Sequence, residues 1–123
     1  MSSTQINVFY ELQVADGKSE ELREIATQMA YFNRQGEPGT LVYNIYLSED
    51  EKLLTYWETH ADSEAMLFHA DRFASGEFIS EVVSRTVGAR LCLYGDVSAE
   101  LRQWATANGF EVEYANYVAG FVR

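Results

Sequence analysis

The chain has 123 residues, with nine basic and nineteen acidic side chains, and a formal charge of −10 at pH 7. This charge argues against binding to nucleic acid or to an anionic membrane, because both need positive charge to displace counterions. With 47% hydrophobic residues spread along its length, a chain of this size can bury a sizeable core, and we expect one domain.

The single cysteine, Cys92, allows no disulfide within the chain, which fits a reducing compartment. The first residues carry no basic leader, and no segment reaches the length of a membrane span. We therefore expect a cytoplasmic protein. Cys92 lies in an apolar run with only Arg90 as a basic neighbour, so we expect a buried structural role for it rather than a nucleophilic one.

A strand and a helix are predicted first. Residues 6–14 are rich in β-formers, and from Ser19 the apolar residues recur at helical spacing until Gly36. The only proline, Pro38, follows, held between Gly36 and Gly39. Proline cannot continue a helix, and both glycines can adopt positive φ, so we expect a compact reversal from helix to strand here.

A hairpin and a second helix follow the turn. Residues 40–47 and 52–60 predict two strands joined by the turn "SEDE". Asp62 is well placed to cap a helix that contains His69. Residues 78–86 predict a further helical turn or two.

The last third of the chain adds three elements. Residues 87–95 predict a fourth strand. Ser98 can cap another helix, for which the Asn108-Gly109 pair is a stop signal, and residues 110–114 alternate as in a fifth strand.

This order predicts an α+β protein with the ferredoxin-like βαββαβ split and an added C-terminal helix and strand. We place residues 5–95 in the core and residues 96–123 in a C-terminal extension of the same domain, 1–123. The strand at 40–47 carries bulky side chains on both faces, whereas two helices cover only one face of such a sheet. Monomers rarely expose so large an apolar face, so we expect a homodimer through the sheet faces.

Two histidines are candidates for chemistry. His60 shares a strand face with Glu58, and His69 lies on the next helix, which could bring it back over Glu58. A carboxylate beside an imidazole suits a general base, although the spacing fits a structural histidine at a subunit edge better. Glu58, His60 and His69 could also hold non-haem iron, but no metal-binding spacing supports this, and we expect no metal.

Aromatic side chains concentrate on segments that should be neighbours. They could line a pocket for a flat aromatic ligand or form ordinary core: Phe9, Tyr10, Tyr43, Tyr46, Tyr56, Trp57 and Phe68. The sequence has no Gly-rich dinucleotide loop, no P-loop and no H-E-x-x-H, so we expect no cofactor.

Residues 37–69 carry several motifs in a characteristic order. A Glu37-Pro38-Gly39 turn precedes a strand with Tyr43, a hairpin leads to Glu58, and Ser63-Glu64-Ala65 opens a helix that carries His69. In this order and spacing, the stretch from 5 to 95 resembles the antibiotic biosynthesis monooxygenase (ABM) domain.

The resemblance implies a dimeric α+β barrel and a cofactor-free oxygenase of phenols or hydroquinones, in which the substrate supplies the electrons. It implies that His69 is the base or the partner of the substrate anion, that Glu58 orients it, and that Tyr43 and Trp57 line the pocket. The predicted substrate-binding set also includes His60, Phe9 and Phe68. The alternative is a non-catalytic dimeric barrel that binds a small aromatic or hydrophobic molecule.

The chain departs from the family pattern in three places. His60 stands where many members have tryptophan. Haem-degrading relatives use an Asn, Trp and His set, but Asn7 is out of phase by two residues and no histidine follows at their spacing, so we expect no haem degradation. Residues 96–123 lie outside the usual domain and could lengthen the sheet, cap the pocket or strap the partner.

Overall fold

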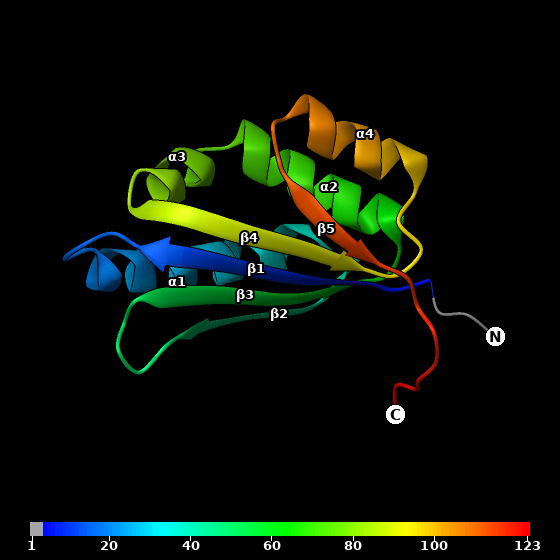
Figure 1. Ribbon diagram of the computed structural model, residues 1–123, viewed down its shortest axis with the longest axis horizontal. Coiled ribbons are helices and arrows are strands. Elements are labelled where there is room, and N and C mark those ends of the chain that lie inside the picture. The colour runs from blue at the N-terminus through cyan, green and yellow to red at the C-terminus, as the bar shows by residue number, and fades with distance from the viewer. Residues whose placement is uncertain (1–3) are drawn as a thin grey trace.

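The computed structural model describes residues 4–123. A five-stranded sheet has the strand order β2-β3-β1-β4-β5, and the helices gather on one side of it (Figure 1). The expected α+β, ferredoxin-like fold class is confirmed, while the dimeric assembly stays a prediction. The elements are β1 (Ile6–Val14), α1 (Ser19–Gly36), β2 (Thr40–Leu47), β3 (Leu53–His60), α2 (Ser63–Ser75), α3 (Phe78–Val83), β4 (Thr86–Tyr94), α4 (Ala99–Ala107) and β5 (Val112–Ala115).

The core lies between the sheet and the helices. Along β1 the alternate residues Ile6, Val8 and Leu12 are buried, and on β3 the residues paired with this face, from Leu54 to His60 in steps of two, are buried as well. Their period of two matches the alternation of side chains along a strand. The helix-covered face of β3 therefore carries Glu58 and His60 into the core.

The turn between α1 and β2 is tight for a different reason from the predicted one. Gly36 and Gly39 can adopt positive φ, but neither is among the glycines that do. Instead, a Cβ on Gly36 would lie 2.6 Å from Nη1 of Arg72, and one on Gly39 would lie 2.6 Å from Cβ of Ala65. The glycines thus let the turn approach α2 closely, which brings Glu37 against that helix.

Both predicted helix caps are present. The Asp62 carboxylate accepts a hydrogen bond from the amide of Ala65 at 2.8 Å and starts α2, and Ser98 accepts one from Leu101 at 3.1 Å and starts α4. The cap at Asp62 sets which residues of α2 face the sheet, and Met66, His69 and Ala70 are the buried ones.

The other face of the sheet has no helix over it. Phe9 and Trp57 meet there edge to face, with ring centroids 6.1 Å apart, and Trp57 remains 45% exposed. Thr59 donates a hydrogen bond to Asn7 on the same face. This mixture of aromatic and polar side chains is the surface for which we predict a second copy.

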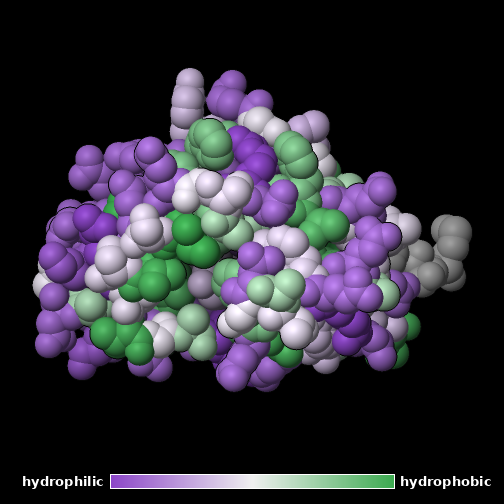
Figure 2. All heavy atoms as spheres, turned by 90° about the horizontal axis from the view of Figure 1, so that it is seen from above, coloured by the Kyte–Doolittle hydropathy of each residue, from purple (hydrophilic) through white to green (hydrophobic). Residues whose placement is uncertain are grey.

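The C-terminal extension lengthens the sheet. Strand β5 pairs in parallel with β4, Leu91 lying opposite Val112, and begins at Val112 rather than at residue 110. Helix α4 lies beside α2 (Figure 1). Seen from above, hydrophobic side chains gather mainly toward the end of the molecule that carries α3 (Figure 2). Within residues 4–123, no helix is both long and apolar enough to cross a membrane.

Candidate functional site

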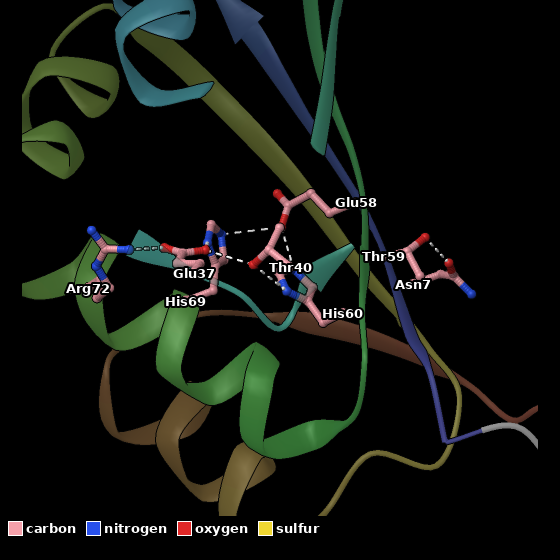
Figure 3. Close-up of polar contacts among 8 residues, drawn as sticks. All are labelled: Asn7, Glu37, Thr40, Glu58, Thr59, His60, His69 and Arg72. Atoms are coloured by element: carbon pink, nitrogen blue, oxygen red, sulfur yellow. Dashed lines mark hydrogen bonds and ion pairs between the residues drawn. The ribbon is translucent and has the colours of Figure 1, made fainter. Parts of the chain in front are cut away.

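Five side chains form a closed ring of hydrogen-bond contacts between the sheet and α2 (Figure 3). His69 Nδ1 lies 2.7 Å from Glu37 Oε1, and His69 Nε2 lies 3.2 Å from Glu58 Oε1. His60 Nε2 lies 2.8 Å from the same Glu58 oxygen, and His60 Nδ1 lies 3.1 Å from the Thr40 hydroxyl. Thr40 Oγ1 closes the ring at 2.7 Å from Glu37 Oε1. We call these five residues the Glu–His ring.

The ring is buried, and its charges determine its protonation. Burial lowers the pKa of His69, but the charges and hydrogen bonds of Glu58 and Glu37 outweigh it and raise the pKa to about 10. Burial raises the pKa of Glu58, but the two imidazoles outweigh it and lower the pKa to about 2. At neutral pH His69 is therefore an imidazolium between two carboxylates.

Arg72 completes the charge balance of the site. Its Nη1 donates to Glu37 Oε2 at 3.0 Å, so each oxygen of the Glu37 carboxylate has a charged partner. The two positive charges of Arg72 and His69 thus balance the two negative charges of Glu37 and Glu58.

Counting protons shows what the ring can accept. Its five contacts need one proton each, whereas the His69 imidazolium supplies two, the Thr40 hydroxyl one and a neutral His60 one. One contact therefore lacks a proton. When His60 carries its proton on Nδ1, the empty contact is the one between its Nε2 and Glu58.

The pKa shifts predict how stability depends on pH. A lowered carboxylate pKa stabilises the fold above the ordinary value of 4.5, and this is lost as the pH falls towards 2. The raised imidazole pKa stabilises it below 6.5, and this is lost as the pH rises towards 10. We expect the free energy of unfolding, measured by urea denaturation, to be highest between these two ordinary values. A curve that stays flat from pH 6.5 to 10 would contradict the imidazolium assignment.

Two small cavities adjoin the ring. Their volumes are about 30 and 50 Å³, and both are lined by Tyr10, Glu58, His69 and Phe73. Within residues 4–123, both imidazole contacts to Glu58 end on Oε1. Oε2 is thus the carboxylate oxygen left for a molecule in these cavities.

Tyrosine hydroxyls surround the smaller cavity. Burial and the charge of Glu58 raise the pKa values of Tyr10, Tyr43 and Tyr56. All three therefore stay protonated and can act as hydrogen-bond donors. The Tyr56 hydroxyl donates to Met29 Sδ at 3.3 Å.

The structure divides the predicted site residues into two groups. His69, Glu58, His60 and Tyr43 come together, and the Tyr43 and His69 rings meet with centroids 5.6 Å apart. His60 itself is fully buried behind Glu58 and lines neither cavity.

The other predicted residues lie elsewhere: Phe9 and Trp57 on the open face of the sheet, and Phe68 on α2 with 52% exposure.

Several residues of the site were not predicted. Glu37 appeared only as part of a turn, although a glutamate beside the only proline was a weak signal for it. The others, which lie far from His69 in the sequence or gave no motif, are Thr40, Arg72, Trp104 and Phe110.

Glu58, His60 and His69 also meet the geometry that a metal site needs, because their potential ligand atoms lie within 4.8 Å of one another. A metal ion bound there would displace the proton that His69 Nε2 shares with Glu58, whereas the Nδ1 contact to Glu37 would remain. As the side chains are arranged, a proton occupies the contact between His69 Nε2 and Glu58.

Comparison with known proteins was made by sequence and by structure. No family model matches the sequence, and no curated protein matches it. Among solved structures, MupZ from Pseudomonas fluorescens is 16% identical, with a TM-score of 0.79, covering 98% of this chain and 96% of its own.

Two structures described as putative antibiotic biosynthesis monooxygenases are also similar. The one from Caulobacter crescentus CB15 is 21% identical with a TM-score of 0.64, covering 74% of this chain and 88% of its own. The one from Deinococcus radiodurans is 18% identical with a TM-score of 0.65, covering 76% and 94%. This chain has the ABM fold. At these identities the likeness concerns the fold alone, and within the ABM fold the Glu–His ring is the feature that bears on chemistry.

Proposed function

We propose that this protein is a cofactor-independent monooxygenase that oxidises a phenolic or hydroquinone-type aromatic molecule with O₂. The observation that carries the proposal is Glu58, a buried carboxylate that lines both cavities. Its Oε1 is tied to two imidazoles, and its Oε2 is left for a ligand. The ABM fold supports the reaction class.

The first step is removal of the phenolic proton. Glu58 Oε2 accepts the proton from the substrate hydroxyl, and since the pKa of Glu58 is low, the proton does not stay there. The carboxyl group then turns, presents its protonated oxygen to Nε2 of His60 and gives up the proton there, which fills the empty contact of the ring. Glu58 and His60 act together as the base.

His69 takes the second of its two predicted roles, the anion partner. As an imidazolium bound to Glu58, it supplies positive charge beside the new phenolate. The aromatic and aliphatic side chains around the cavities keep water away from the anion.

The remaining steps balance without an added reductant. The substrate anion donates electrons to O₂, and a carbon–oxygen bond forms at a ring carbon that carries hydrogen. That carbon then loses its proton while the O–O bond breaks. One oxygen atom stays in the quinone, and the other leaves as water.

A second function, ligand binding without catalysis, is favoured by one observation. Cavities of about 30 and 50 Å³ are smaller than the roughly 150 Å³ of a cavity that takes benzene. An aromatic ring therefore enters the site only when a wall of these cavities moves. In either case we propose a homodimer through the open sheet face and a small aromatic molecule as the ligand.

Oxygen uptake tests the oxygenase. We expect the purified protein to consume O₂ with some members of a panel of hydroquinones, polyphenols and naphthols, above the rate of autoxidation and unaffected by a chelator. With ¹⁸O₂, one labelled atom should appear in the product. Uptake that a chelator abolishes would point to a metal enzyme instead, and no uptake across the panel would leave a binding protein.

A further inference from the structure

The C-terminal extension contributes the outer wall of the larger cavity. Trp104 on α4 and Phe110 before β5 stack on each other, with ring centroids 5.4 Å apart and an interplanar angle of 16°. Both line the cavity of about 50 Å³ whose inner end is formed by Glu58 and His69. The added helix and strand therefore reach the same site as the Glu–His ring.

This aromatic pair belongs to the partly buried part of the wall. Val8, Met66 and Ala70, which also line the cavity, are buried between the sheet and α2, whereas Trp104 and Phe110 are only partly buried. Trp104 is fixed by a long hydrogen bond, 3.4 Å from its Nε1 to the exposed Asp71. The turn between the two rings contains Gly109 with φ +76°.

The cavity has two chemically different ends. Glu58, His69 and Tyr10 make the inner end polar, and because the charges of the ring and Arg72 balance, this end favours a neutral hydroxyl over an ion. The outer end is lined by two aromatic rings, which favour contact with another flat ring. The chain's charge of −10 further disfavours an anionic ligand.

We infer that Trp104 and Phe110 form a stacking subsite that selects neutral, hydroxylated ligands with two or more fused aromatic rings. The hydroxyl lies at Glu58, the distal ring lies against Trp104 and Phe110, and the pair moves outward to admit it. This inference rests on the proposed function for the position of the hydroxyl at Glu58.

Fluorescence under anaerobic conditions tests the subsite without turnover. In a Trp57→Phe variant Trp104 is the only tryptophan, and we expect 2-naphthol to change its emission saturably. By calorimetry, Trp104→Leu and Phe110→Leu should each weaken 2-naphthol binding by about tenfold, while Trp104→Phe should keep most of the affinity. Decahydro-2-naphthol, which keeps the hydroxyl but lacks a flat ring, should bind at least about tenfold more weakly than 2-naphthol.

Three results would overturn the subsite: no saturable binding of 2-naphthol to the wild type, equal affinity of folded leucine variants and wild type, or saturation that leaves Trp104 emission unchanged. Circular dichroism checks that each variant is folded. Because these binding measurements are made without O₂, a negative result for the subsite can be told apart from a negative result for the oxygenase reaction. A Trp104 response without oxygen uptake would keep the subsite and remove the proposed reaction, and uptake without a Trp104 response would do the reverse.

Discussion

Replacing His69 by glutamine is expected to lower the free energy of unfolding by about 3 to 5 kcal/mol. His69 is the only cation between Glu37 and Glu58, whose carboxylates are both buried, and it contacts one with each ring nitrogen. Without it, Glu58 keeps only its contact to His60, and Glu37 keeps Arg72 and Thr40. The two buried carboxylates then lack the positive charge that lay between them.

Urea denaturation at pH 6 measures this loss, and a second substitution identifies its cause. If uncompensated charge is responsible, Glu37→Gln added to His69→Gln should recover part of the stability, since it removes one of the two negative charges. Glu64→Gln, at an exposed position of the same helix, is the matched control and should change stability by less than about 0.5 kcal/mol. A loss of less than 1 kcal/mol for His69→Gln would show that the ring is not held together by charge.

Replacing Glu58 by glutamine is expected to reduce the rate of protein-dependent oxygen uptake by a factor of about 10² to 10⁴. Glutamine has nearly the same shape, but its amide cannot accept the phenolic proton and pass it to His60. The variant also loses one of the two charges that raise the pKa of His69, which weakens the stabilisation of the substrate anion by this side chain.

The measurement compares kcat for wild type, Glu58→Gln and the control Glu64→Gln with whichever substrate the panel identifies. Binding of the same substrate under anaerobic conditions separates lost chemistry from a lost site. A Glu58→Gln variant that is folded, binds substrate and retains full oxygen uptake would remove Glu58 from the reaction.

Much of the fold could be predicted from local patterns. The alternation along residues 6–14 and 52–60, the helical spacing after Ser19 and the caps at Asp62 and Ser98 are properties of neighbouring residues, and the structure has the predicted elements there. The meeting of His69 with Glu58 was also predictable, because a strand followed by a short connection and a helix brings the helix back over the strand.

Other parts of the site depend on contacts that no local pattern encodes. Glu37 and His69 are 32 residues apart, and their contact requires a turn that packs closely on α2. Trp104 comes from an extension whose position depends on its packing against α2, β4 and residues of β1.

The prediction that Trp57 and Tyr43 line the same pocket did not take account of the alternation of side chains between the two faces of a strand. Tyr43 on β2 pairs with Glu58 on the neighbouring strand β3, so the two side chains lie on the same face of the sheet. Trp57 is next to Glu58 in β3, and its side chain must therefore point to the other face.

Because two carboxylates flank His69 in the folded protein, folding is coupled to the uptake of a proton. At pH 8 the imidazole of the unfolded chain, with its ordinary pKa of 6.5, is mostly neutral, whereas in the fold it is charged. Each molecule that folds at this pH therefore takes about one proton from the buffer. The heat of folding consequently contains the ionisation enthalpy of the buffer and differs between phosphate and Tris. A calorimeter can thus detect the closure of this site with no substrate present.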